Sequence, residues 1–388
     1  MLPRSAAESK QSPIMQTQDF DIIVIGAGIV GATAGAALAE HRRVALLEAE
    51  EVAGYHSTGR SAALWILNYG PPDVRVLTGA SRAFFEAPPG GFTETPLMSR
   101  RPILFLAPEH QVEELRKMLA EGQGLRELTV DQACALVPAI RPAYPAAAAI
   151  EDDAFDIDVA ALHQGFLRQF RRRGGEIALR NRAGRIDFRH GQWEAHTSAG
   201  AIFRAPIVVN AAGAWGDEVA KIAGVAPIGL VPHRRTGVIL DPAPWDVQHW
   251  PSVNDVAHTW YSRPEARTKL MISPADETPM EPNDVQPDEL DVAIAVDRMQ
   301  QALDIEVRRV ERSWAGLRSF TPDRNLAIGF EPGVDGFFWC VGQGGYGIQT
   351  SPAAGRFVAD LILGRDMGAA AAIVRTVDPG RFRAGACG

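Results

Sequence analysis

The sequence has few cysteines, no excess of basic residues and no long apolar run, and each absence excludes a class of protein. Its 388 residues include three cysteines, Cys134, Cys340 and Cys387, whose spacing fits neither a metal site nor a CxxC motif. With 39 basic and 47 acidic residues the net charge is −8, which argues against nucleic acid as a partner. The longest apolar runs have the length of strands, so no transmembrane segment is predicted.

The size of the chain and its N-terminal residues set the outline of the molecule. Residues 1–18 are polar and lack the apolar core of a signal peptide, so they are interpreted as a flexible leader, with Met15 as a more natural start. With 46% hydrophobic residues, a chain of this length can bury a large core and is expected to form two domains. Scattered thiols are typical of a reducing compartment, so a cytoplasmic protein is predicted.

The most informative segment is 21–48, which reads DIIVIGAGIVGATAGAALAEHRRVALLE. An apolar, β-branched run ends in a GxGxxG motif, and a small-residue helical stretch then leads to a second apolar run closed by Glu48. Gly26 permits the tight turn, Gly28 lets a pyrophosphate approach the backbone, and Gly31 brings helix and strand close together. The helix N-terminus offers free N–H groups to phosphates, and Glu48 is placed to bind the adenosine ribose. The segment predicts a dinucleotide site.

Three further segments separate a flavin site from a nicotinamide site. Loop 54–63, GYHSTGRSAA, offers hydroxyl and N–H donors to a second stretch of phosphate and ribityl chain, and Arg60 is expected to neutralise pyrophosphate charge. Segment 336–350, GFFWCVGQGGYGIQT, leads into a helix predicted over 351–363, whose N-terminus would stabilise a reduced flavin. Segment 206–215, PIVVNAAGAW, is a buried strand ending in small residues, where the backbone can pass close to the cofactor.

Together with WAGLRSF at 314–320, these motifs resemble the glycine/D-amino-acid oxidase (DAO) superfamily over about residues 19–363, and within it the D-arginine dehydrogenases. The resemblance implies non-covalent FAD in an α/β, Rossmann-like domain of the glutathione-reductase type, beside an α+β substrate domain built on an antiparallel sheet. It also implies the following cofactor-binding residues: Gly26, Gly28, Ile29, Val30, Gly31, Glu48, Ala49, Ser57, Thr58, Gly59, Arg60, Ser61, Ala62, Ala63, Leu64, Ala183, Ala212, Gly213, Trp215, Gly316, Gly344, Gly345, Tyr346, Gly347, Ile348, Gln349 and Thr350.

The coarse pattern fits a discontinuous arrangement of the two domains. The FAD domain is predicted from segments 19–80, 150–225 and 317–372, the substrate domain from 81–149 and 226–316, and a tail from 373–388. A helix is predicted over 159–173, capped by Asp156 or Asp158 and ended by two glycines, and a second helix over 287–303.

The α-carboxylate of an amino acid needs fixed cations, and arginine is suited to pair with it through two hydrogen bonds. By resemblance Arg235, Arg318 and Tyr261 hold the carboxylate, Tyr69 closes over the pocket on a mobile loop, and Gly345 lies at the reaction site. Two alternatives stay open at this point: Arg318 could form a structural ion pair, and the neighbouring Arg234 and His233 leave the choice of arginine on that strand undecided.

The predicted pocket for the substrate side chain departs from the family in two places. Ile103 occupies the position of a guanidinium-binding carboxylate, and Leu64 that of a pocket histidine, so the pocket is predicted to be more apolar. Phe105, Trp65 and Trp260 belong either to its wall or to the core. D-Leu, D-Met or D-Phe should therefore be better substrates than D-Arg or D-Lys, and Ile103→Glu with Leu64→His should shift the preference to basic substrates.

These observations predict an FAD-dependent dehydrogenase or oxidase that oxidises the C–N bond of a neutral or apolar (D-)amino acid. Hydride transfer from Cα to flavin N5 would give an imino acid, then a 2-oxo acid and ammonia. The alternatives are a substrate with an N-substituted amine, such as an N-methyl or iminodiacid compound, and a 2-hydroxy acid, which usually requires a base such as histidine. A flavoprotein with a binding or tRNA-modifying role is disfavoured by the acidic charge.

Two expectations concern the flavin itself. Covalently flavinylated relatives carry a cysteine near the position of residues 319–322, where this chain has none. Relatives that react fast with O2 carry a lysine that falls opposite Leu270, one residue from Lys269, and a shift of one residue in a strand turns a side chain to the other face. The electron acceptor, a quinone, a dye or O2, stays open, and a membrane-bound acceptor would bring the protein to a membrane surface.

Overall fold

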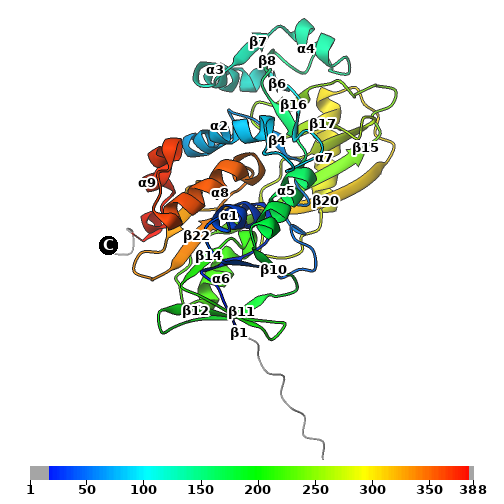
Figure 1. Cartoon of the computed structure of the whole chain (residues 1–388). Coiled ribbons are helices and arrows are strands. Elements are labelled where there is room, and N and C mark those ends of the chain that lie inside the picture. Colours follow the sequence, from blue (N-terminus) through cyan, green and yellow to red (C-terminus); the bar gives the residue numbers. More distant parts are fainter. Residues whose placement is uncertain (1–16, 384–388) are drawn as a thin grey trace, which may run out of the picture.

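The computed structural model describes residues 17–383, which form two lobes joined by several strands (Figure 1). In the lower lobe of the figure, short apolar runs form a six-stranded sheet in the order β10-β3-β2-β14-β22-β21, and only the β21–β22 pair is antiparallel. Its strands are buried on both faces, as expected of a largely parallel sheet. Their bounds are β2 Ile22–Ile25, β3 Val44–Leu47, β10 Glu176–Ala178, β14 Ile207–Asn210, β21 Ala327–Phe330 and β22 Phe337–Val341.

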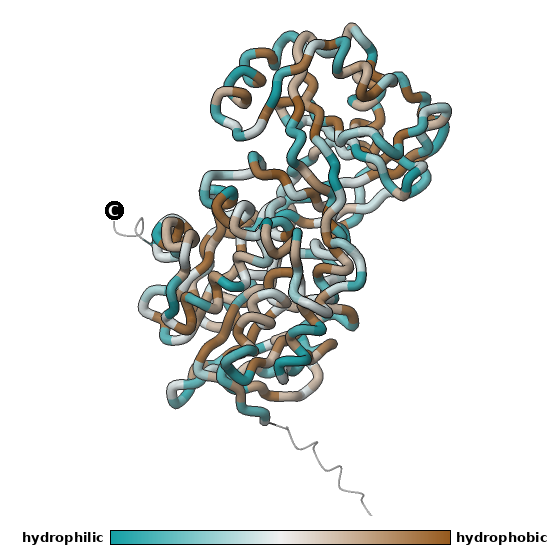
Figure 2. The backbone as a smooth tube through the Cα atoms, turned by 45° about the horizontal axis from the view of Figure 1, so that its top comes forward, coloured by the Kyte–Doolittle hydropathy of each residue, from teal (hydrophilic) through white to brown (hydrophobic). Residues whose placement is uncertain are grey.

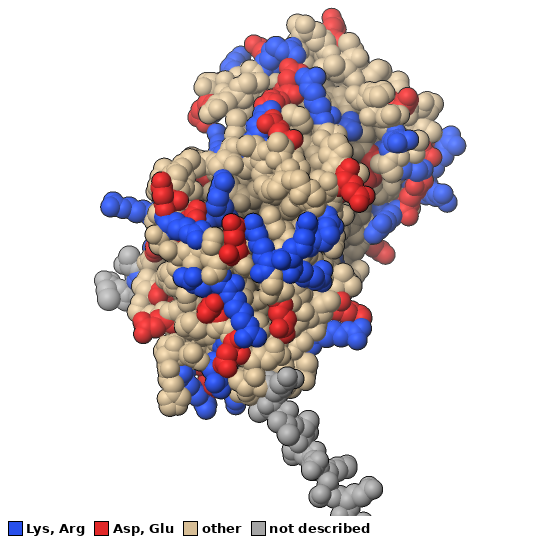
Figure 3. Space-filling model, in the orientation of Figure 1, with Lys and Arg blue, Asp and Glu red and all other residues tan. Residues whose placement is uncertain are grey.

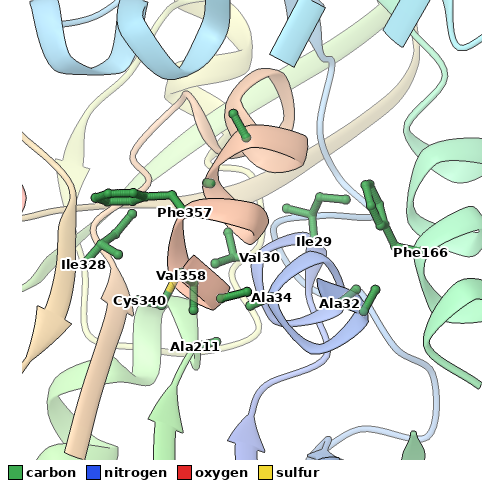
Figure 4. Close-up of a cluster of buried hydrophobic side chains, with 14 of the residues drawn as sticks. Ile29, Val30, Ala32, Ala34, Phe166, Ala211, Ile328, Cys340, Phe357 and Val358 are labelled. Carbon is green, nitrogen blue, oxygen red and sulfur yellow. The ribbon is translucent and has the colours of Figure 1, made fainter. Parts of the chain in front are cut away.

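Helices cover one face of this sheet and are themselves packed closely. α1 (Ile29–Leu38) packs between α8 (Gly347–Leu363) and α5 (Val159–Arg172), and α2 (Pro72–Glu86) packs on α8. The α1–α8 crossing depends on small residues, because a Cβ on Gly355 would lie 2.6 Å from the Thr33 backbone. Figure 4 shows the resulting core, in which Val30 and Ala34 of α1 lie next to Val358 of α8, and Ile29 lies toward Phe166 of α5.

The other face of the six-stranded sheet packs on α6 (Gly216–Ile222) and on a four-stranded sheet in the order β1-β13-β12-β11. The bounds of these strands are β1 Thr17–Asp19, β11 Ala183–Arg189, β12 Gln192–Thr197 and β13 Ile202–Ala205. The predicted leader is wrong at its end, because Thr17 and Gln18 pair with β13. Residues 1–16, including Met15, lie outside the described residues, as does Cys387.

The upper lobe is built on a nine-stranded sheet with the order β19-β15-β18-β17-β16-β6-β8-β7, in which β15 also pairs with β20. Its strands are β6 Ile103–Ala107, β7 Leu125–Leu128, β8 Ala147–Glu151, β15 Val231–Leu240, β16 Ser252–Asp255, β17 Tyr261–Glu265, β18 Lys269–Ser273, β19 Thr278–Pro279 and β20 Val310–Phe320. The expectation of an antiparallel sheet is wrong for one pair, because β6 and β16 run parallel. The sheet is mixed, and the predicted α/β fold class is confirmed.

Smaller elements complete the two lobes. Helices α3 (Val112–Glu121), α4 (Val130–Leu136) and α7 (Glu289–Ala302) lie on the upper sheet, and α9 (Val374–Val377) packs on β21. A separate three-stranded sheet has the order β4 (Leu64–Trp65), β9 (Phe155–Ile157), β5 (Met98–Arg100). Figure 2 shows hydrophobic stretches running through the middle of both lobes.

Local signals predicted the start of α5 but not that of α8. The Asp158 carboxylate caps α5 by accepting from the Ala161 N–H at 2.8 Å, and Asp288 caps α7 in the same way. α8 begins at Gly347, four residues before the expected start, although Pro352 lies inside it. The Ser351 hydroxyl donates to the Ile348 carbonyl, which Pro352 cannot reach for lack of an N–H, and this bond lets the helix start early.

The proposed division into two domains differs from the packing at two boundaries. The second half of α2 lies beyond the boundary predicted at residue 80, but Phe85 is buried in the core shared with α8. The predicted tail from 373 begins with buried residues of the same core, Ile373 and Val377. Apolar side chains that recur at helical spacing explain both differences, because they pack these segments into the core of the lower lobe.

Two surface features bear on partners. Among the residues of 17–383, no helix combines the length and the hydropathy needed to cross a membrane. On the face shown in Figure 3, acidic and basic side chains are interspersed and the basic ones gather across the middle. The negative net charge is therefore not concentrated on this face.

Candidate active site

A cavity of about 710 Å³ extends from the GxGxxG turn to the upper sheet and is lined by residues of both lobes. All but three of the predicted cofactor-binding residues line it; the exceptions are Gly31, Gly59 and Thr350. These three have structural roles. A side chain at Gly31 or Gly59 would collide with neighbouring backbone atoms, and the Thr350 hydroxyl donates to the Tyr346 carbonyl. The motifs that lie far apart in the sequence therefore meet in one cavity.

The nucleotide end of the cavity lies where β2 and β3 end and α1 begins. The Glu48 carboxylate closes β3 and accepts from the Ala27 and Glu50 N–H groups, each at 3.0 Å. The Thr58 hydroxyl, from the second predicted motif, accepts from the Ile29 N–H at 3.0 Å in the first turn of α1. Loop 54–63 is thus fastened directly to the helix N-terminus that the sequence predicts to bind phosphates.

Glycines make this end of the cavity a cradle that side chains would fill. Gly26 has a φ of +103°, which other residues rarely adopt, and a Cβ on it would lie 2.5 Å from the Ala211 carbonyl oxygen. A Cβ on Gly31 would overlap the Gly26 carbonyl oxygen. Near the other end, a Cβ on Gly345 would lie 2.6 Å from the Tyr69 hydroxyl and 2.9 Å from Arg318 Nη1. The residues present fit a flat, extended cofactor with a pyrophosphate.

Arg60 is placed differently from what the sequence predicts. It lines the cavity, but its guanidinium donates to the Val285 and Ala315 carbonyls and pairs with the Asp284 carboxylate. An arginine that is already neutralised in this way does not supply free charge to a pyrophosphate. Asp284 lies 224 residues away in the sequence, so the motif alone gave no sign of this partner.

The predicted carboxylate-binding residues converge from four separate segments. Arg235 lies on β15 and Arg318 on the paired strand β20, where Arg235 is opposite Gly316, two residues from Arg318. Arg318 Nη1 donates to the Tyr69 hydroxyl at 3.1 Å. Tyr261, on β17, lines the cavity beside them.

Strand alternation decides between the neighbouring arginines. Arg235 lines the cavity, donates through Nε to the Asp276 carbonyl at 2.9 Å, and forms a salt bridge with Glu277. Arg234 points to the other face of β15, where it pairs with Asp276, Asp288 and Asp291, and does not line the cavity. His233 packs on Phe320 instead.

The electrostatics of this group favour an anion. Burial lowers the pKa of Arg235, and the like charge of Arg318 lowers it further. Burial alone would raise the pKa of the Tyr261 hydroxyl, but the charges of Arg318 and Arg235 outweigh it and lower that pKa. Among residues 17–383, no carboxylate lies within salt-bridge distance of Arg318. The alternative that Arg318 forms a structural ion pair is therefore wrong. Arg235 is paired with Glu277, which Arg324 also binds, so the positive charge of Arg318 is not neutralised by a salt bridge within residues 17–383.

The side-chain end of the cavity has a different wall from the one predicted. Leu64 lines it together with Ile66, Phe105 and Met118. Ile103 does not, because it is completely buried in a core cluster of the upper lobe. Trp65 and Trp260 are each 1% exposed and belong to the core as well. The prediction that Ile103 lines the pocket is therefore wrong, and Ile103 gives no evidence that the pocket is uncharged.

Several polar residues of the cavity wall have no motif in the sequence that predicts them, among them Glu151, Asn254 and His258. Glu151 ends an apolar run, and a carboxylate at the end of a buried strand was a signal that could have been noticed. His258 lies in a turn with a φ of +54°, and its ring centroid is 6.4 Å from those of both Tyr69 and Phe105. Burial lowers the pKa of His258, so its imidazole is neutral at pH 7. No sequence motif predicts a functional role for His258.

Comparisons with known proteins agree with this geometry. The model of the family "DAO: FAD dependent oxidoreductase" matches residues 21–361. The chain is 25% identical over 371 residues to a glycine oxidase of Bacillus licheniformis, covering 89% of this chain and 93% of that protein. It is 29% identical over 177 residues to the bovine (Bos taurus) "FAD-dependent oxidoreductase domain-containing protein 1", of which it spans only about a third, 35%.

The fold is similar to that of a solved glycine oxidase from Geobacillus kaustophilus, with a TM-score of 0.78 over 90% of this chain and 95% of that chain. At 20% identity this similarity shows the fold alone. The closer resemblance to D-arginine dehydrogenases stays a prediction.

Proposed function

Because this chain belongs to the DAO family of FAD-dependent oxidoreductases, we propose that it oxidises the C–N bond of an amino acid. The observation that carries the proposal is the pair Arg235 and Arg318, which face one cavity with Tyr69 and Tyr261. Within residues 17–383 Arg235 forms a salt bridge with Glu277, whereas Arg318 forms none. Such a pair is suited to an α-carboxylate, which accepts paired hydrogen bonds from guanidinium groups. FAD is the cofactor.

The chain's own contribution is to hold and orient the substrate. Arg235 and Arg318 bind the carboxylate, Tyr69 and Tyr261 add hydroxyl donors, and the backbone of Gly345 leaves room at the reaction site because it carries no side chain. Bound FAD would supply the two-electron acceptor for a hydride from the substrate Cα, and water would then hydrolyse the resulting imino acid to a 2-oxo acid and ammonia. The other predicted cofactor-binding residues that line the cavity, from the GxGxxG motif to Gln349, would form the walls of the FAD site.

One observation favours a second candidate, the oxidation of a 2-hydroxy acid. That reaction uses the same carboxylate-binding arginines but needs a base for the hydroxyl proton, and a neutral imidazole lies in the cavity at His258. An N-substituted amine, such as an N-methyl or iminodiacid compound, stays the alternative within amine chemistry.

The products of turnover distinguish these reactions. With an artificial dye as acceptor, a panel of D- and L-amino acids, N-methyl amino acids, iminodiacids and 2-hydroxy acids should be screened for dye reduction. A primary amino acid releases ammonia, an N-methyl substrate releases formaldehyde, and a 2-hydroxy acid releases neither. Dye reduction by 2-hydroxy acids alone would overturn the proposal in favour of the second candidate.

For the substrate side chain, the sequence predicts a neutral or apolar group. Leu64, Ile66, Phe105 and Met118 support an apolar environment for its methylene stem. The end of the substrate side chain has no apolar contact with Ile103, because Ile103 does not reach the cavity.

We expect FAD to be bound without a covalent link. The only cysteine near the cofactor motifs is Cys340, which lies in β22 with 1% exposure, and burial raises its pKa to about 12. A protonated thiol inside the core is no nucleophile for the flavin. Acid precipitation of the purified protein should therefore leave the yellow colour in the supernatant. A coloured pellet would contradict the prediction.

We also expect slow reoxidation by O2, and thus dehydrogenase behaviour. Lys269 does not line the cavity but pairs with Glu311 at 2.7 Å and Asp241 at 3.5 Å, while Leu270 is buried in the core of the upper lobe. No lysine is among the cavity-lining residues of the described chain. Stopped-flow mixing of the reduced protein with air-saturated buffer checks this, and reoxidation within milliseconds would contradict it.

A further inference from the structure

Glu151 is a buried acid at the side-chain end of the cavity. It is the last residue of β8, is only 2% exposed, and lines the cavity close to Asn68 and Met118. In the upper sheet it lies opposite Ile103 of β6 on one side and Leu125 of β7 on the other. Directly paired residues share a face of the sheet, so Glu151 stands beside Ile103 on the neighbouring strand, and of the two only Glu151 lines the cavity.

This acid has no counter-ion of its own within residues 17–383. None of their arginines, lysines or histidines forms a salt bridge with it, and its Oε2 atom is buried without a hydrogen-bond partner. The two acids that follow it in the chain are paired at the surface, Asp152 with Arg126 and Asp153 with Arg82. A buried carboxyl without a counter-ion, and with one oxygen unbonded, lowers stability, so packing gives no reason for its presence.

The groups packed around Glu151 leave it the only charge at this place. β6 carries no ionisable residue, and Arg126 of β7 is opposite Ile150, so it projects to the other face. Burial raises the pKa of Glu151 to about 7, and Asp153 adds to the rise, whereas Asn68 and the Leu67 backbone act against it. The charged residues of α3, which packs on this strand, are exposed to solvent: Glu113, Glu114, Arg116, Lys117 and Glu121.

We infer that Glu151 recognises the end of the substrate side chain and selects an ammonium or guanidinium group there. The inference rests on the proposed amino-acid oxidation. The cavity then has two charged ends, arginines for the α-carboxylate and a carboxylate for the distal cation, with Leu64, Ile66 and Met118 along the methylene stem. The acid missing at Ile103 is supplied from the neighbouring strand.

The test compares two substrates in two variants. In the enantiomer that the wild-type protein oxidises, lysine or arginine is compared with methionine, which has a similar stem and no charge. At pH 8.5, Glu151→Gln should lower kcat/KM for the cationic substrates by about a hundredfold or more, because their charge loses its buried partner. For methionine kcat/KM should change by less than about threefold. Glu127→Gln is the matched control, because Glu127 is an exposed acid on the adjacent strand β7.

The pH dependence gives a second readout that a structural role would not produce. Because the raised pKa makes Glu151 ionised above about pH 7 and neutral below it, the ratio of kcat/KM for lysine to that for methionine should rise roughly tenfold from pH 6 to pH 8 in the wild-type protein. In Glu151→Gln this ratio should be flat, and in Glu151→Asp part of the rise should return. Requirements shared by both substrates, such as loss of the α-ammonium proton, cancel in the ratio.

The outcomes separate this inference from the function it rests on. Equal losses for lysine and methionine in Glu151→Gln, or unchanged values for both, would overturn the role of Glu151 while leaving amino-acid oxidation intact. If no amino acid reduces the flavin of the wild-type protein, the proposed function itself fails. Flavin content and thermal unfolding of each variant identify a general folding defect, which would also count against a specific role in recognition.

Discussion

Replacing Arg318 by methionine should lower kcat/KM for the best amino-acid substrate by about three orders of magnitude. Arg318 is partly buried and bonded to the Tyr69 hydroxyl, and it has no acid of its own, so its charge is available to a carboxylate. Removing one partner of a desolvated charge pair typically costs 2–5 kcal/mol or more, roughly thirtyfold to several thousandfold. Arg318→Lys should recover only part of the loss, because an ammonium lacks the planar fork of donors.

The second arginine provides an internal check. Arg235→Met should cause a loss of similar size, and the double variant should lose much less than the product of the two, because both side chains bind the same carboxylate. Arg312→Met is the matched control: Arg312 lies on the same strand β20 but is exposed. Steady-state kinetics with the dye acceptor and flavin content measure these effects. Independent, multiplicative losses, or a loss in the control, would contradict a shared carboxylate site.

Features that depend on neighbouring residues in the chain were predictable from the sequence. The glycine motif, its flanking strands, Glu48 and the Asp158 cap all act within one supersecondary unit, so spacing alone specifies them. The choice between Arg234 and Arg235 was also local in principle, since neighbours in a strand face opposite sides. It became decidable only when the partners of Arg234 on α7 and its N-cap were known.

Features that depend on pairing between distant strands were not predictable. Ile103 was placed in the pocket because of its position in the chain, but the register of β6 and β8 puts Glu151 there instead. Arg60 was expected to bind phosphate, but Asp284 from the other lobe neutralises it. In each case the side chain's partner is more than 40 residues away, and composition carries no information about which strand lies next to which. The polarity of the pocket therefore had to come from the structure.

Gly31→Ala should remove most of the bound FAD and lower the free energy of unfolding by about 3 kcal/mol, at the upper end of the range for overpacked sites. Gly31 does not line the cavity, so a model based on cofactor contacts alone would predict no effect. The added methyl group would overlap the Gly26 carbonyl oxygen and lie 3.0 Å from its carbon. Both are backbone atoms of the turn between β2 and α1, so neither can give way as a side chain would.

The consequence is a displacement of α1 from the end of β2, which moves the first-turn N–H groups that the phosphates need. The same helix offers a control, Gly35→Ala, whose Cβ would meet only the Phe170 ring, at an ordinary 3.4 Å. That variant should retain FAD and unfold at the same or a slightly higher temperature, because alanine favours a helix over glycine by about 1 kcal/mol. The ratio of flavin to protein absorbance and thermal unfolding with and without added FAD measure both effects. If Gly31→Ala kept its FAD at the wild-type level, close packing of α1 on β2 would not be what positions the phosphate-binding turn.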